Sequence, residues 1–329
     1  MSRLAGQSPA DSIKAAPAKD SSFRIACIGL LTAVILPGQQ PPPRPAELHL
    51  LPVQSHIYML VGAGGNITLQ IGKQGVLMVD SGLAANASAA YAEVRKLTNL
   101  PVRYIINTHV HPDHLGGNEA LAKLIPPNRA QPLAVIMNEN VLNRLTAPAA
   151  GNITTPNPLG FPVDEYYLPF KSLHYNGEAV IVYHEPNAHT DGDSVVLFRG
   201  SDVIATGDIF TPDAYPFIDV ARGGSVEGEL KALTHILELT VPANNEEGGT
   251  LVIPGHGRLC EETDVAEFRD MVAIVRDRIQ DGIRKGETLA QIKAHRPTLD
   301  YDTEYMQQGS FVTGEMFVEA VYKSLMGEK

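Results

Sequence analysis

The sequence contains no tryptophan and only two cysteines, Cys27 and Cys260, in 329 residues. Two thiolates cannot build a zinc ribbon or an iron–sulfur cluster, because both need more sulfur ligands. Cys27 lies in an N-terminal apolar stretch with the features of a removable leader, so Cys260 would then stand alone. We therefore expect no disulfide framework.

Positive charge is also scarce, with 26 Lys and Arg against 37 Asp and Glu and a net charge of -11. Nucleic-acid phosphates require clustered cations, so we expect no nucleic-acid partner. The glycine-rich segment 62–66 lacks the Gly-Lys-Ser/Thr ending of a phosphate-binding loop, which argues against nucleotide binding. It precedes a predicted strand and is interpreted either as a flap over a site or as a plain approach to a hairpin.

The N-terminus has no apolar run long enough to span a bilayer comfortably. The stretch from Ile25 to Leu36 instead suits the apolar region of an export signal, of roughly 7–15 residues, and basic residues precede it. We predict that residues 1–46 form a signal or anchor followed by a Pro-rich spacer, and that the protein is exported, periplasmic or secreted. Membrane contact would then occur only through this segment. The alternative is a disordered tail.

Residues 47–329 have the pattern of a folded α/β domain with a helical C-terminal part. Strands alternate with helices, which indicates sheets covered by helices. The predicted strands are Ile67–Ile71, Val76–Asp80, Val102–Asn107, Val135–Ile136, Ala179–Tyr183, Ser194–Phe198, Val203–Ala205 and Leu251–Ile253. The predicted helices are Ala84–Leu97, one capped by Asn138, one capped by Ser225, an apolar stripe from Val265 to Ile283, and Phe311–Leu325. Residues Pro148–Pro169 are predicted to be a long loop.

Three histidines and one aspartate fall within six residues directly after a predicted strand: His109, His111, Asp113 and His114. In extended backbone His109 and His111 face the same side and can share one metal ion. Asp113 and His114 lie where the chain turns toward a helix, so they can face a second metal ion. Imidazole and carboxylate ligands suit zinc.

Three further candidate ligands lie at strand ends. His189 precedes a predicted strand, whereas Asp208 and His256 each follow one. Glycines beside them let each side chain reach a shared point. Alone, each is equally well interpreted as a structural histidine or a turn aspartate. Together with the cluster, they favour a common site.

The ordered series of these seven residues resembles the ligand pattern of binuclear hydrolases in the metallo-β-lactamase fold superfamily, from about Leu48 to the C-terminus. The resemblance implies an α/β fold of the αβ/βα sandwich type, with two mixed sheets flanked by helices. It implies two zinc ions, with iron or manganese as possible substitutes. Metal one would be held by His109, His111 and His189, metal two by Asp113, His114 and His256, and Asp208 would bridge them.

Asp80 matches the strand-end aspartate of that superfamily and would orient a ligand, although a simple turn former is the alternative. Asp208 stands where classical antibiotic-hydrolysing members usually have Cys or Ser, and it resembles the glyoxalase II, lactonase and RNase Z branches. The implied reaction is cleavage of an ester, thioester, lactone or lactam in a small molecule by a metal-bridging hydroxide. Asp113 would be catalytic, orienting the nucleophile and accepting its proton.

Two other functions stay open: a mononuclear iron enzyme resembling persulfide dioxygenases, and a β-lactamase proper. On the substrate side, four loop aromatics are interpreted as pocket walls or, more readily, as packing residues: Tyr166, Tyr167, Tyr215 and Phe217. The histidines without motif context are expected to be structural or surface residues: His49, His56, His174, His184, His235 and His295.

Overall fold

The computed structural model describes residues 47–129, 132–147, 163–242, 248–306 and 310–327. All of them belong to one unit, Pro45–Lys329. The predicted leader and spacer lie outside the described residues, as do residues 148–162 of the predicted long loop. Among the described residues, no helix combines the length and the apolar character needed to cross a membrane.

The first sheet follows the order of the chain. Within the described residues its strands are β1 (His49–Pro52), β2 (Ile57–Val61), β3 (Ile67–Gly72), β4 (Gly75–Val79), β5 (Val102–Ile106), β6 (Ala134–Asn138) and β7 (Val163–Tyr166). Strands β1 to β4 pair antiparallel, and β4 to β7 pair parallel. The change of direction follows from the connections, because a tight turn joins β3 to β4 whereas helices link the later strands.

The second sheet has the order β13-β12-β11-β10-β9-β8. Its strands are β8 (Phe170–Tyr175), β9 (Glu178–Glu185), β10 (Asp193–Phe198), β11 (Val203–Ala205), β12 (Leu251–Ile253) and β13 (Cys260–Glu261). Only β11 and β12 pair parallel among these strands. Both sheets are therefore mixed, as predicted.

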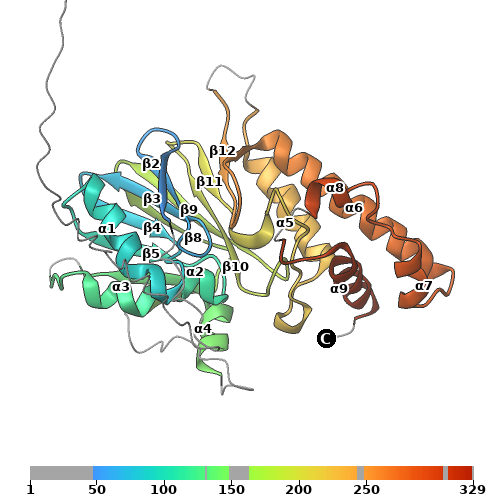
Figure 1. Cartoon of the computed structure of the whole chain (residues 1–329). Helices are drawn as coiled ribbons and strands as arrows, with labels where there is room; N and C mark the ends of the chain where they lie inside the picture. Colours follow the sequence, from blue (N-terminus) through green and yellow to red (C-terminus); the bar gives the residue numbers. More distant parts are fainter. Residues whose placement is uncertain (1–46, 130–131, 148–162, 243–247, 307–309, 328–329) are drawn as a thin grey trace, which may run out of the picture. The chain divides into compact units, whose positions relative to one another are not determined.

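Helices cover the outer face of each sheet (Figure 1). The helices are α1 (Ala87–Leu97), α2 (Pro112–Leu115), α3 (Asn118–Leu124), α4 (Glu139–Thr146), α5 (Val226–Leu239), α6 (Glu262–Arg284), α7 (Leu289–Ala294), α8 (Asp302–Tyr305) and α9 (Gly314–Met326), with short 3₁₀ turns η1 (Ala84–Asn86), η3 (Gly207–Ile209) and η4 (Val220–Arg222). The side chains of Asn138 and Ser225 accept hydrogen bonds at the starts of α4 and α5, as their sequence context predicts.

Alternating strand residues build the core between the two sheets. Val79 and Ile136 of the first sheet belong to the same buried cluster as Val182 and Val196 of the second. The residues between them face the helices instead, with Met78 packed in the cluster that includes α1 and Val195 in the cluster that includes α6. Helices, sheet, sheet and helices thus form successive layers, and the αβ/βα sandwich is confirmed.

The sequence predictions were wrong in three respects. The predicted loop ends early, because Val163–Tyr166 pairs parallel with β6 as an edge strand; its polar Asp164 and Glu165 obscure the strand pattern. The last helix begins at Gly314 rather than Phe311, because the Thr313 side chain caps it. Strands β1, β2, β8 and β13 were not predicted at all. The edge strand β1 exposes three of its four residues, and the edge strand β8 exposes alternate residues.

One carboxyl group is buried in the packed layer beneath the second sheet. Glu229 on α5 has no exposed surface, and neither of its oxygens has a hydrogen-bond partner among the described residues. Burial raises the pKa of Glu229 well above its ordinary value of 4.5, and the charges of Asp193 and Asp208 raise it further. The folded protein therefore holds this group as a neutral acid.

We predict that Glu229→Met stabilises the metal-free protein at high pH. The unfolded chain releases this proton near pH 4.5, whereas the folded protein keeps it. The free energy of unfolding of wild type therefore falls as pH rises above this value, because deprotonation favours the unfolded chain. Unfolding in urea should show the variant about 1–3 kcal/mol more stable than wild type at pH 8 and less so at pH 5. Glu227→Met, on the exposed side of the same helix, is the control. A gain independent of pH would contradict the assignment.

Candidate metal centre

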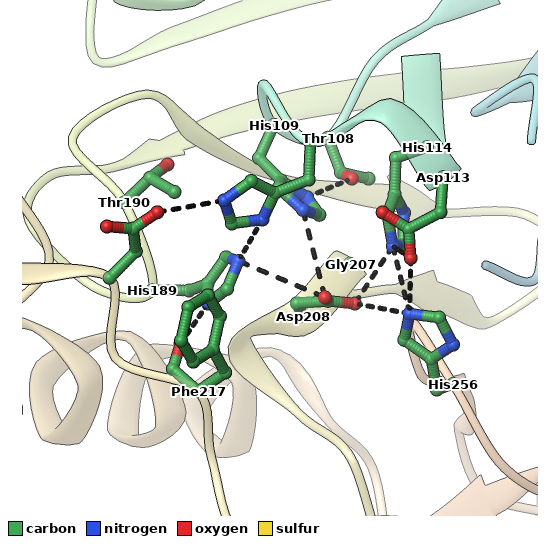
Figure 2. A network of polar contacts seen from close by, with 12 residues as sticks. Thr108, His109, Asp113, His114, His189, Thr190, Gly207, Asp208, Phe217 and His256 are labelled. Atoms are coloured by element: carbon green, nitrogen blue, oxygen red, sulfur yellow. Dashed lines mark hydrogen bonds and ion pairs between the residues drawn. The ribbon is translucent and has the colours of Figure 1, made fainter. Parts of the chain in front are cut away.

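Four chain segments bring polar side chains to one place (Figure 2). His109 and His111 lie in the loop after β5, and Asp113 and His114 lie on α2. His189 precedes β10, Asp208 lies on η3 after β11, and His256 follows β12. Since β5, β11 and β12 each end beside this place, the sandwich itself gathers the residues that the sequence scatters over about half of the chain.

The ligand atoms fall into two groups. In each group, one ligand atom from every member lies within 4.8 Å of the others; the groups are His109, His111, His189 and Asp208, and Asp113, His114 and His256. The structure thus brings together all seven residues predicted from the sequence. A site able to hold metal ions is present, and the partition into two groups has the form that the resemblance implied.

Asp208 belongs to the first group and also faces the second, as Figure 2 shows. Its Oδ2 atom is 3.8 Å from His109 Nε2 and 3.9 Å from His189 Nε2. Its Oδ1 atom is 3.1 Å from His114 Nε2 and 3.5 Å from His256 Nε2. One carboxylate oxygen therefore faces each group, which is the geometry that a carboxylate shared by two cations needs.

The nitrogen atoms also fit cations. His111 Nδ1 faces His189 Nε2 at 2.9 Å, and His114 Nε2 faces His256 Nε2 at 3.2 Å. His109 Nε2 is buried without a hydrogen-bond partner among the described residues. Lone pairs that converge in this way, together with carboxylates, form a donor set suited to zinc and also acceptable to iron or manganese.

The pKa values of His109 and His189 in the metal-free protein agree with this. Burial lowers the pKa of His109 well below its ordinary value and that of His189 to about 4, so both are neutral imidazoles able to ligate. Burial raises the pKa of Asp208, but His114 and other histidines outweigh it and hold this pKa well below its ordinary value. Burial likewise lowers the pKa of His114, but Asp208 and Asp80 outweigh it and raise this pKa.

Three outer partners fix which ring nitrogen faces the cluster. His114 Nδ1 donates to Asp80 Oδ2 at 2.8 Å, His111 Nε2 donates to Asp219 Oδ2 at 2.9 Å, and His189 Nδ1 donates to the Phe217 carbonyl. Each leaves the other nitrogen for a metal ion. Asp80 was predicted in this role, whereas Asp219 was missed, because it lies in a loop with no motif around it.

Asp80 also fixes the loop that carries the first histidine. Its two oxygens accept hydrogen bonds from the backbone N–H and the hydroxyl of Thr108, both at 2.8 Å. Asp80 adopts a left-handed backbone conformation, with φ of 64°, which aspartate tolerates better than most residues. The interpretation of Asp80 as a mere turn former therefore misses its contacts.

The glycine-rich segment 62–66 packs against the site. Gly65 N–H donates to the Asp113 carbonyl, and the Asn66 side chain donates to the carbonyls of Pro254 and Gly257 on both sides of His256. A Cβ atom on Gly65 would lie 2.3 Å from the His114 ring. These contacts favour the plain approach to the strand over the flap.

A cavity of about 560 Å³ opens beside the cluster. Asp113, Asp208 and His256 line its polar side, and Phe217 and Tyr215 contribute to its apolar side. Tyr215 is also a packing residue, since its hydroxyl donates to the Thr298 carbonyl. Tyr166 is buried and hydrogen-bonded to Ser194, and Tyr167 is exposed, so neither forms part of the wall.

Sequence reasoning missed the wall residues from the C-terminal part of the chain. Phe311 and Val312 line the cavity, but the pattern placed Phe311 in a helix. The six histidines without motif context lie outside both groups. Among them His235 pairs with Glu185 at 2.6 Å and His184 Nε2 bonds the Asp191 carbonyl.

We predict that Asp80→Asn weakens zinc binding about 10–100-fold, because the amide cannot reproduce both the Thr108 contacts and the acceptor for His114. Titration against a competing chelator measures this. Asp202→Asn is the matched control: Asp202 also has a positive φ and accepts from a threonine hydroxyl, but it lies at the other end of β11 from Asp208. Equal affinities for Asp80→Asn and wild type would refute the orienting role.

Solved structures share this fold at low sequence identity. A stereoselective inverting sec-alkylsulfatase from Pseudomonas sp. aligns with a TM-score of 0.66 and 19% identity, covering 85% of this chain and 50% of the other. The metallo-beta-lactamase from Pontibacter korlensis aligns with a TM-score of 0.53 and 16% identity, covering 69% of this chain and 99% of the other. This chain thus spans about half the length of the alkylsulfatase. No curated protein matches the sequence closely enough to count as a relative.

The sequence model of the Metallo-beta-lactamase superfamily matches residues 60–256, which include all seven residues of the cluster. The match covers more than half of the chain, and the two-sheet architecture agrees with it. The chain belongs to the metallo-beta-lactamase superfamily.

Proposed function

We propose that this protein is a binuclear metallohydrolase that cleaves an ester, thioester, lactone or lactam bond in a small molecule. The observation that carries the proposal is the position of Asp208, with one oxygen toward each group of ligands. A carboxylate in that position would be able to ligate two metal ions at once. A single-metal enzyme has no need of the second group.

The seven residues of the cluster would have different roles in metal binding. His109, His111 and His189 would hold one ion, Asp113, His114 and His256 the other, and Asp208 would contribute to both. Zinc is the proposed metal, with iron or manganese as substitutes. When bound, zinc lowers the pKa of a water molecule toward about 7 and polarises the bond to be cleaved.

Asp113 is the proposed catalytic carboxylate. Its side chain is 34% exposed, lines the cavity, and lies 3.1 Å from His256 Nε2. Burial raises the pKa of Asp113, but His256 and His114 outweigh it and lower this pKa below its ordinary value, so the group is ionised at neutral pH. An ionised carboxylate at the cavity surface can orient a nucleophile and accept a proton.

Two alternative functions are less well supported by the arrangement of the cluster. A mononuclear iron enzyme of the persulfide dioxygenase type needs one metal group, and the second group here counts against it. A β-lactamase proper is disfavoured by Asp208, which replaces the usual Cys or Ser.

Export through residues 1–46 is a separate proposal, and we expect a small-molecule substrate rather than a nucleic acid.

Metal analysis of the purified full chain is the first test. We expect two zinc ions per chain and turnover of at least one member of a panel of aryl esters, thioesters, lactones, β-lactams and secondary alkyl sulfates. The last class is included because the similar solved structures include a sec-alkylsulfatase. One iron per chain with no hydrolysis would overturn the proposal.

Variants of the cluster are the second test. Loss of a residue that only orients a metal ligand lowers metal affinity or activity about 10–100-fold. Loss of a ligand itself should have a larger effect, so Asp208→Ala and His114→Ala should each lower kcat/KM at least about a hundredfold. His235→Ala, which removes a histidine paired with Glu185 away from the cluster, should leave kcat/KM unchanged. Unchanged turnover in Asp208→Ala and His114→Ala would show that the site is wrongly assigned.

A further inference from the structure

Among the described residues, Arg222 is the only lysine or arginine that lines the cavity. It lies at the end of η4, on the same cavity as His111 and Phe217. The carboxylate of Asp219 fixes it twice: Oδ1 accepts from the Arg222 backbone N–H at 3.0 Å, and Oδ2 accepts from its guanidinium at 2.6 Å. Arg222 is therefore held in place before any ligand arrives.

The guanidinium keeps donors to spare. Only one of its terminal nitrogens is engaged with Asp219, whereas a guanidinium carries five N–H donors. Its side chain is 35% exposed. The Asp219 carboxylate is itself shared, because His111 Nε2 also donates to it at 2.9 Å. Asp219 thus occupies only part of the Arg222 guanidinium, and the free part of the fork suits a carboxylate or sulfate group.

The other lining of the cavity is apolar. Phe311 is 75% exposed, a high value for a phenylalanine, and its ring packs edge-on against Phe217 with centroids 5.6 Å apart. Val312 and Ala214 continue this surface. An exposed phenylalanine packed against the half-buried Phe217 on a cavity wall indicates a ligand with an apolar body.

We propose that the substrate is an amphiphilic anion, with its negative group on Arg222 and its apolar body on Phe217 and Phe311. This inference rests on the proposed function and names the class of substrate for the same site. Arg222 is then a specificity-determining residue that contacts substrate, and Asp219 positions both Arg222 and His111.

Calorimetric titration tests the recognition without turnover. The probes are hexyl sulfate, hexanoate and hexanol, titrated into zinc-loaded wild type, Arg222→Gln and Arg222→Lys. The control is Arg269→Gln, an arginine of similar exposure on α6 that pairs with Asp270. We expect Arg222→Gln to weaken the anions about tenfold or more and to leave hexanol unchanged. Arg222→Lys should recover part of the loss, and Arg269→Gln should bind as wild type. A larger loss for hexyl sulfate than for hexanoate would identify sulfate as the preferred group, and the reverse would identify carboxylate.

The outcomes separate the two proposals. Repeating the titration with zinc-free protein shows whether Arg222 recognises anions even if no metal binds and the proposed hydrolase function fails. Phe311→Ala should weaken all three probes, because it removes apolar contact. If hexyl sulfate and hexanol bind wild type equally, or if Arg222→Gln weakens them equally, the inference is wrong, since a purely structural Arg222 would affect both alike. In wild type, rising salt should weaken only the anions.

Discussion

The structure depends on the burial of converging lone pairs at one edge of the sandwich. His111 Nδ1 and His189 Nε2 face each other at 2.9 Å, although the second nitrogen of each ring already donates to another acceptor, so neither facing nitrogen has a proton to share. His109 Nε2 has no hydrogen-bond partner among the described residues. Burying such groups is costly unless a positive charge compensates them. A pair of metal ions would supply that charge, and the fold brings ligands for them from four separate segments of the chain.

The surrounding backbone leaves these side chains little freedom. Asp80, in a left-handed conformation, holds Thr108 and His114 together, and Gly65 allows the chain to pass against the His114 ring. At Gly255 a Cβ atom would lie 2.0 Å from Asp208 Oδ1. The glycines that the sequence shows beside each candidate ligand therefore serve close packing as much as turning.

Much of the fold and the ligand set could be predicted from the sequence. Alternating apolar residues mark the buried strands, and the short spacing from His109 to His114 makes the cluster visible. His189, Asp208 and His256 needed the cluster for their interpretation. Asp219 and Phe311 could not be predicted, because each acts through contacts between residues far apart in the chain, such as the 108 positions between His111 and Asp219. Arg222 pairs with a residue only three positions away, but its place on the cavity wall depends on the fold. The edge strand β7 was missed because two of its four residues are acidic.

Phe311 and Val312 stand more than fifty positions beyond the last of the seven ligands, and outside the segment that the superfamily model matches. The part of the chain that would hold metal and the part that shapes one wall of the cavity are thus separate stretches of sequence. Substitutions near residue 311 can alter which compounds enter without touching a ligand or its outer partners. Related chains could then share one reactive centre and differ in substrate range through their C-terminal segments. Exchange of this segment between chains would then change the substrate range and leave the ligand residues in place.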